Sequence, residues 1–146
     1  MDLKLKYPPF NVRMRTDRGV PMIFDLIRKK WLQLSPEEWV RQHLLNYLTQ
    51  HAAYPASTIA VEKEIKLNDT KKRFDVVIYD RALQPFMVVE CKAPYIALDE
   101  SVIEQALRYN LILKAPYVMI SNGVSDLVFK ASAEQTDLPP ASALIL

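Results

Sequence analysis

Three strand-forming segments in the middle of the chain restrict its possible folds more than any other feature of the sequence. They lie at residues 58–67, 72–79 and 86–92, and turn-forming residues separate them, Asn68-Asp69 in the first gap and residues 80–85 in the second. A parallel connection needs about a dozen residues or more. The short separations therefore favour an antiparallel meander of three strands.

Helical patterns flank this meander on both sides. Before it, Ser35 supplies a hydroxyl cap and Pro36 fits the first helical position, so a helix is expected to continue to about residue 50. After it, apolar residues at helical spacing predict a second helix over about 99–113, followed by strands at 117–121 and 126–130 on either side of a turn signal, Asn122-Gly123. The order helix, three strands, helix, strand indicates an α/β fold with a mixed central sheet flanked by helices.

The two ends of the chain show less regular patterns. Apolar residues alternate with lysines over residues 3–7, which fits either a short edge strand or an ordered arm, and residues 22–34 have no clean period. Residues 131–146 include two consecutive prolines and are expected to pack loosely or to form a tail. With a hydrophobic content of 50%, the whole chain, residues 1–146, is expected to fold as one domain.

Cysteine usage and hydropathy restrict the cellular compartment. The single cysteine, Cys91, excludes an intramolecular disulfide, and the sequence shows neither a signal-peptide pattern nor an apolar run near the roughly 18 residues of a membrane span. These observations predict a cytoplasmic protein that has no membrane partner.

Charge is distributed unevenly along the chain. Residues 1–34 carry eight Lys and Arg against three Asp and Glu, a surplus of +5, whereas residues 35–146 carry eleven against fourteen. A basic N-terminal arm over residues 1–21, continued by basic residues at 28–30, could contact a phosphate backbone and release its counterions. A solvated charged surface explains the same pattern, so the charge distribution leaves both interpretations open.

Two acidic residues interrupt the apolar strands of the predicted meander. Asp75 stands within the second strand and Glu90 near the end of the third, each about five residues from the turn that joins them. A hairpin brings these two residues to the same end, and strand alternation places Lys92 on the face of Glu90 and Cys91 on the opposite face. Two adjacent carboxylates repel each other unless a cation joins them, and oxygen ligands select Mg²⁺ or Mn²⁺. We therefore expect a metal-dependent phosphodiesterase site in which Lys92 orients or deprotonates a water.

Acidic residues at the start of the first predicted helix are further candidates. On a helical projection, Glu37 falls on the inward stripe of the helix (Val40, Leu44, Tyr47 and Leu48), whereas Glu38 falls off this stripe and fits the capping position. Glu37 is therefore expected to point inward. There it would be either a functional acid or a carboxylate satisfied by first-turn exposure or by a hydrogen-bonding partner.

A purely structural interpretation of the acidic residues is the main alternative. In that interpretation Glu90 and Lys92 form a salt bridge, and Arg73 or a turn satisfies Asp75. An acid and a lysine two residues apart are common in any sequence. Their position at the end of a buried strand, one hairpin away from another acid, favours the functional interpretation.

Other residue types offer less for catalysis. His43 and His51 have no Cys or acidic partners at zinc-ligand spacing and are expected on the surface. The chain has only two glycines, so it has no glycine-rich phosphate loop. Cys91 is expected to be a buried small residue and not a nucleophile.

The motifs Arg73-Phe74-Asp75 and Glu90-Cys91-Lys92, together with the element order, resemble the PD-(D/E)xK nuclease superfamily. Phe74 occupies the proline position of the motif. Four further segments resemble the N-terminal nuclease domain of type I restriction enzyme R subunits, in the stand-alone form of Bacteroides-type bacteria: residues 23–31, 35–42 and 90–94, and the Gln-x-x-x-Tyr element at 105–109. This resemblance covers roughly residues 22–125.

The resemblance implies a role for each matching residue. Asp75, Glu90 and the Cys91 carbonyl would ligate Mg²⁺ or Mn²⁺, Lys92 would be the catalytic lysine, and Glu37, or less readily Glu38, would be the acid from the first helix. Gln105 and Tyr109 would meet the DNA backbone or brace the site, although core packing explains Tyr109 equally well. Arg41 and Arg73 would contact DNA or support the site.

The resemblance also implies partners and an activity. We expect a metal-dependent DNA endonuclease related to restriction, acting on DNA, with other restriction-system subunits as candidate partners. A homodimer is a further candidate, because a double-strand break usually calls for two sites. The chain has no room for the ATP-driven motor of a complete R subunit. The alternative is a non-catalytic nucleic-acid-binding or assembly protein that retains the fold.

Overall fold

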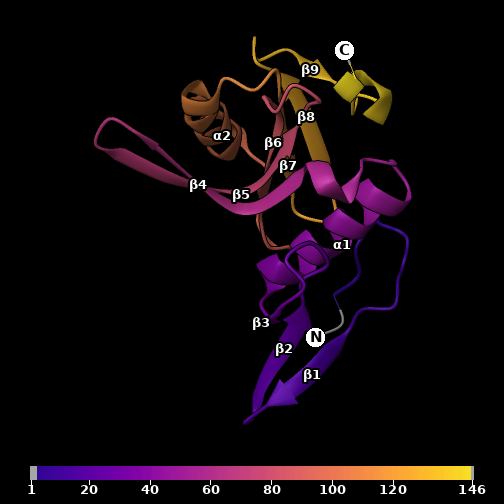
Figure 1. The fold of residues 1–146 in the computed structure, drawn as a ribbon. Helices are drawn as coiled ribbons and strands as arrows, with labels where there is room; N and C mark the ends of the chain where they lie inside the picture. The colour runs from indigo at the N-terminus through magenta and orange to yellow at the C-terminus, as the bar shows by residue number, and fades with distance from the viewer. Residues whose placement is uncertain (1–2, 146) are drawn as a thin grey trace.

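Two β-sheets and two α-helices make up the fold (Figure 1), which the computed structural model describes for residues 3–145, the side chains of residues 67 and 145 aside. The larger sheet is mixed and has the strand order β4-β5-β6-β7-β8-β9. Its strands are β4 (Ile59–Leu67), β5 (Thr70–Tyr79), β6 (Pro85–Cys91), β7 (Tyr117–Ser121), β8 (Asp126–Lys130) and β9 (Gln135–Thr136). The smaller sheet has three strands, β1 (Met14–Asp17), β2 (Val20–Phe24) and β3 (Trp31–Gln33).

The central meander agrees with the prediction from the sequence. Strands β4, β5 and β6 pair antiparallel in sequence order, and β6 then pairs parallel with β7. Helix α2 (Glu100–Leu113) makes the connection that this parallel pair requires. The expected α/β fold with a mixed sheet is therefore confirmed.

Helix α1 (Pro36–Gln50) begins and packs as its sequence indicates. The Ser35 hydroxyl accepts a hydrogen bond from the Glu38 amide at 3.0 Å, which satisfies one of the free amides at the helix start. Val40, Leu44 and Leu48 are fully buried against one face of the large sheet. At about 1.5–3 kcal/mol for each buried aliphatic side chain, this stripe is the main attachment of α1.

Helix α2 covers the other face of the large sheet. Val102, Ala106, Tyr109 and Leu113 pack with residues of that face, as their helical spacing predicts. The Asp99 side chain caps the helix by accepting a hydrogen bond from the Val102 amide at 3.1 Å. The sheet thus lies between α1 and α2, and the ends of β5 and β6 lie within reach of both helices.

The N-terminal region is an ordered segment followed by the small sheet. Residues 3–10 form no strand, but Tyr7 is buried and the Lys6 amide donates to the Gly123 carbonyl at 2.8 Å, so the segment is an ordered arm and not an edge strand. Much of the ambiguous 22–34 region belongs to β2 and β3, which extend with β1 from the body of the molecule (Figure 1). The predicted basic arm is therefore an ordered segment that leads into the small sheet, and Arg15 of its basic residues lies within a strand.

Aromatic residues hold two arginines of this small sheet. The Arg13 guanidinium carbon lies 4.2 Å from the centroid of the Phe24 ring, and that of Arg15 lies 4.3 Å from the centroid of the Trp31 ring. Both arginines remain exposed. Stacking leaves the N–H groups of a guanidinium available for other partners.

The C-terminal segment packs against the large sheet, which corrects the expectation of a loose tail. Gln135–Thr136 pairs with β8 as strand β9, and the Tyr54 hydroxyl donates to the Pro139 carbonyl. Leu144 is only 4% exposed, and its carbonyl accepts a hydrogen bond from the Arg81 amide at 2.9 Å. The consecutive prolines suggested a tail, but tertiary contacts fix the segment.

None of the described helices combines the length and the hydropathy that crossing a membrane requires.

Candidate functional site

Asp75 lies where the hydrogen-bond ladders of the large sheet are interrupted. The register of β5 places Asp75 opposite Glu62 of β4 on one side and opposite Glu90 of β6 on the other. The β4–β5 ladder skips the Asp75–Glu62 pair, and the β5–β6 ladder ends one residue before the Asp75–Glu90 pair. Glu62 has a positive φ of 52°, which a non-glycine residue rarely adopts. The regular pairing of β5 with both of its neighbours is therefore interrupted at Asp75.

The Asp75 carboxylate has one hydrogen-bond donor from the neighbouring strand. Its Oδ2 accepts from the Cys91 amide at 2.8 Å, which holds the end of β6 against the middle of β5 where the ladder between them stops. Asp75 also lines a cavity with Ser35, Glu37, Glu38, Arg41 and Glu62, on the side of α1. Asp75 thus faces the start of the first helix as well as the third strand.

Glu90 is the most strongly perturbed carboxyl group of the site. Burial first, and then the negative charge of Asp75, raise the pKa of Glu90 from 4.5 to about 8, while Lys72 and Lys92 act in the opposite direction. Its Oε1 is buried and has no hydrogen-bond partner among the described residues. A buried oxygen without a donor is costly, so the site favours a ligand or a proton at this position.

Lys92 follows β6 directly and is half-buried. Its amide donates to the Ser121 carbonyl at 2.8 Å, which anchors the backbone to the end of β7. Its side chain lines a cavity of about 210 Å³ together with Glu90 and residues of α2. The structure thus places Asp75, Glu90 and Lys92 at one end of the sheet, as the hairpin argument predicts.

The salt bridges proposed by the structural alternative do not form. Within residues 3–145, no ion pair links Glu90 to Lys92 or Asp75 to Arg73. Arg73 is exposed and lies 3.7 Å from Glu64 instead. The acids of the site are therefore not neutralised by the partners that a structural ion-pair network would use.

The two acids of α1 exchange the positions expected from the helical projection. Glu37 is exposed and not inward, whereas Glu38 is buried and binds Arg41 and Gln42 instead of completing the cap. The projection failed because the first helical turn lies at the interruption of the sheet pairing, where a cation was available to Glu38.

Glu37 nevertheless belongs to the site. Partial desolvation first, and then the negative charge of Asp75, raise the pKa of Glu37, and Lys92 lowers it. The charges of Asp75 and Lys92 therefore act on both Glu37 and Glu90, and Glu37 is the exposed member of this group.

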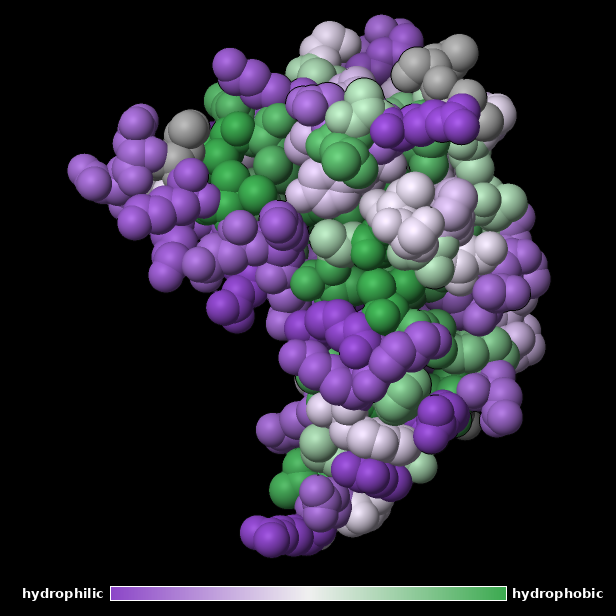
Figure 2. All heavy atoms as spheres, viewed as in Figure 1, coloured by the Kyte–Doolittle hydropathy of each residue, from purple (hydrophilic) through white to green (hydrophobic). Residues whose placement is uncertain are grey.

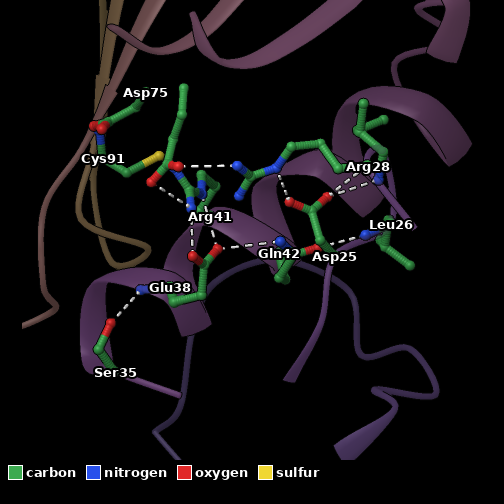
Figure 3. A network of polar contacts seen from close by, with 11 residues as sticks. Asp25, Leu26, Arg28, Ser35, Glu38, Arg41, Gln42, Asp75 and Cys91 are labelled. Carbon is green, nitrogen blue, oxygen red and sulfur yellow. Dashed lines mark hydrogen bonds and ion pairs between the residues drawn. The ribbon is translucent and has the colours of Figure 1, made fainter. Parts of the chain in front are cut away.

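A buried ionic network supports the site from the side of α1 (Figure 3). Arg41 donates to Glu38 at 2.8 Å through Nε and to Glu62 at 3.3 Å, and Glu62 also accepts from Arg28 at 2.9 Å. Arg28 in turn binds the fully buried Asp25 at 2.7 Å. The network connects the turn between β2 and β3, helix α1 and β4 beside Asp75. Arg41 is only 6% exposed and also lines the cavity of Asp75, so its role as a DNA contact or as a support of the site stays a prediction.

Gln105 and Tyr109 lie on one face of α2 beside the site. The Gln105 amide donates to the Tyr109 hydroxyl at 3.2 Å, and both residues line the same cavity as Glu90 and Lys92. Tyr109 also packs with the core on this side of the sheet. The ring of Tyr109 thus packs partly in the core beside the cavity, and its contact with DNA or its support of the site stays a prediction.

Several residues differ from their predicted surroundings or were not predicted. His43 is buried, not on the surface, because its ring packs against Trp39 and Phe10 and bonds the Trp39 carbonyl at 2.8 Å. Cys91 is buried in the core, as predicted.

Sequence reasoning missed Lys72, which lines the cavity of Glu90. Residues two apart on a strand share a face, so Lys72 lies on the face of the buried Phe74, on the strand that carries Asp75. A lysine on a buried face was the signal in the sequence that could have identified it.

The donor set of the site fits a hard divalent cation. Glu90 has a buried oxygen that lacks a hydrogen-bond partner among the described residues, and burial first, then the negative charge of Asp75, raise the pKa of both Glu90 and Glu37. No group of three His, Cys, Asp or Glu side chains in the described part of the chain is gathered closely enough to enclose a metal. Two carboxylates and a backbone carbonyl suit Mg²⁺, which usually keeps several waters, better than a metal that demands a complete protein shell.

Comparison with known proteins adds a family and a fold. A family model described as "Type I restriction enzyme R protein N terminus (HSDR_N)" matches residues 36–143. A solved fragment of a putative HsdR subunit of a type I restriction enzyme from Vibrio vulnificus YJ016 has a similar fold, with a TM-score of 0.59 at 20% sequence identity. The similarity covers 76% of this chain and 24% of that one. No curated protein matches the sequence.

Proposed function

The chain belongs to the family of type I restriction enzyme R protein N termini, and from this premise we propose that it is a metal-dependent DNA endonuclease module of a restriction system. The observation that carries the proposal is that Asp75 and Glu90 lie next to each other and near Lys92, and that neither carboxylate forms an ion pair with a described residue. Family membership supports a restriction-related nuclease domain. The geometry of the acids and the lysine supports hydrolysis.

The proposed chemistry divides the work among these residues. Asp75, Glu90 and the Cys91 carbonyl would hold Mg²⁺ or Mn²⁺, with Glu37 as a further acid at the exposed side. When bound, such a cation supplies polarisation of the phosphate and a lowered pKa for coordinated water. Lys92 would orient or deprotonate the attacking water, or stabilise negative charge that develops on the phosphate oxygens.

Exposed basic groups on two projections support DNA as the substrate. The β4–β5 hairpin carries Lys63 and Lys66 on its surface, and the small sheet carries Arg15, with Arg13 exposed just before its first strand. Figure 2 shows hydrophilic side chains over this hairpin and a hollow in the surface between it and the part of the molecule below. Such basic groups would attract a phosphate backbone and release its counterions.

Lys92→Ala is the variant that tests the proposed activity. In Mg²⁺ or Mn²⁺, wild-type protein is expected to cleave DNA, and the variant is expected to lose about 100-fold or more of this activity, because positioned proton-transfer groups contribute on that order. Its DNA binding in EDTA is expected to remain close to wild type. Cleavage is measured on a fluorescently labelled duplex and binding by fluorescence anisotropy.

Lys130→Ala is the matched control for this test. Lys130 is an exposed lysine on β8 whose nearest acid, Glu134, lies 3.9 Å away, and its variant is expected to cleave as wild type does. Purifying the variants identically also controls for a contaminating nuclease. DNA binding without any metal-dependent cleavage by the wild type would favour the non-catalytic alternative, and equal cleavage by Lys92→Ala would contradict the role of Lys92.

A further inference from the structure

Lys72 is a basic residue at the site to which neither the family nor the motif assigns a role. It lies on β5, three residues before Asp75, and is half-buried. It lines the cavity of about 210 Å³ together with Glu90, Lys92, Gln105 and Tyr109. Two lysines therefore face a polar cavity in which one wall carries the Glu90 carboxylate.

The neighbours of Lys72 on the strand have carboxylate partners, whereas Lys72 has none within residues 3–145. Lys71 lies 3.4 Å from Glu64, and Arg73 lies 3.7 Å from the same carboxylate. The Lys72 ammonium instead rests over an aromatic ring, with its Nζ 4.1 Å from the centroid of Tyr109. A cation held by a ring keeps its charge and its N–H donors for an anion.

Tyr109 is itself held in place by its helix. The Gln105 amide donates to its hydroxyl at 3.2 Å, and its ring packs with the core cluster under α2. The ring therefore fixes the position of the Lys72 ammonium at the cavity. This arrangement resembles a preorganised anion site more than a mobile surface lysine, whose ammonium would sample many positions.

We propose that Lys72 binds a phosphate of the DNA backbone in this cavity, next to the phosphate that is cut, and that Tyr109 positions its ammonium. The inference rests on the proposed nuclease function and names a further substrate contact of the same site. Asp75, Glu90 and Glu37 repel a phosphate, and the charge of Lys72 offsets this repulsion. Because its contact is made equally before and during hydrolysis, Lys72 contributes mainly to binding.

Lys72→Met tests this role, since methionine keeps the aliphatic stem and removes only the charge. The dissociation constant for a labelled DNA duplex is measured in EDTA over a series of salt concentrations. The variant is expected to bind about tenfold more weakly at low salt, and the slope of log K against log salt is expected to fall by about 0.9, the value for one phosphate contact. In Mg²⁺, KM is expected to rise while kcat changes little.

Three further variants separate a specific contact from a general change of charge. Lys71→Met removes the same charge from the adjacent residue and is expected to keep the wild-type slope, because Lys71 already lies beside Glu64. Lys72→Arg is expected to restore the slope. Tyr109→Leu is expected to weaken DNA binding as Lys72→Met does. The double variant is expected to bind little more weakly than either single variant, since both changes disrupt the same contact between Lys72 and Tyr109. Thermal unfolding establishes that each variant is folded.

The outcomes distinguish this inference from the proposed function. If Lys72→Met keeps the wild-type affinity and salt slope, or if Lys71→Met changes them equally, the phosphate contact of Lys72 is overturned, whether or not the protein cleaves DNA. If the wild type binds DNA with the Lys72-dependent slope but does not cleave it, only the nuclease activity is overturned. A wild type that does not bind DNA overturns both.

Discussion

Individual carboxylates in this protein have different surroundings, and their pKa shifts follow from these. The pKa of Glu90 is raised because burial and Asp75 disfavour its charge. At Asp25 burial also acts to raise the pKa, but hydrogen bonds from the Arg28 and Ile27 amides and from the Arg28 side chain outweigh it, and the pKa is lowered below 3.8. The first pattern is typical of functional sites and the second of structural ones.

Asp25→Asn is expected to lower the free energy of unfolding by about 3 kcal/mol at neutral pH, as for the loss of one partner of a buried ion pair. Because the folded pKa of Asp25 lies below its unfolded value of 3.8, the stabilisation is present above that value and is lost as pH falls through the folded pKa. Urea unfolding at neutral and acidic pH measures this. The difference from wild type should shrink in acid.

Asp17→Asn provides the comparison for Asp25, because Asp17 is exposed on β1. It is expected to change stability by less than about 0.5 kcal/mol. A loss at Asp25 no larger than this would contradict the structural role assigned to the network of Figure 3.

Residue positions were predictable where they depend on strand periodicity and not where they depend on a distant partner. Strand alternation gave the common location of Asp75, Glu90 and Lys92 at the end of the hairpin. It could not give the burial of Glu38, which depends on Arg41 and the distant Glu62. The catalytic roles themselves remain predictions.

At the scale of elements, short-range signals defined both α-helices and the strands β4 to β8. Ser35-Pro36 began α1, and turn residues separated the strands of the meander within a residue or two of their observed bounds. The small sheet was not predicted, because its strands are short and largely exposed and have no alternating apolar pattern. The C-terminal segment was misjudged because a proline pair signals irregular backbone but not whether that backbone is packed.

Leu144→Ala tests the packing of the C-terminal segment. Leu144 is only 4% exposed within the core cluster that α1 also joins, so the substitution is expected to lower the free energy of unfolding by about 2–4 kcal/mol. Leu83→Ala is the control, since Leu83 is 79% exposed and is expected to change stability little. Equal effects in urea unfolding would mean that the segment is as loose as its sequence suggested.

At the scale of the whole molecule, the fold places one end of a mixed sheet between two helices. Helix α1 contributes Glu37 from one side and α2 contributes Gln105 and Tyr109 from the other, while the strands contribute the acids and lysines. The chain covers only 24% of the HsdR fragment that it resembles. How this domain acts with DNA and with other restriction subunits is therefore part of the proposal.

The central claim is that Asp75 and Glu90 together hold a divalent cation, and a crystal soaked in Mn²⁺ tests it most directly through anomalous difference density. The account predicts a peak between the two carboxylates and next to the Cys91 carbonyl, with Lys92 beside it and not bonded to Glu90. The absence of a peak there, with Glu90 paired to Lys92 or Lys72 instead, would contradict the claim.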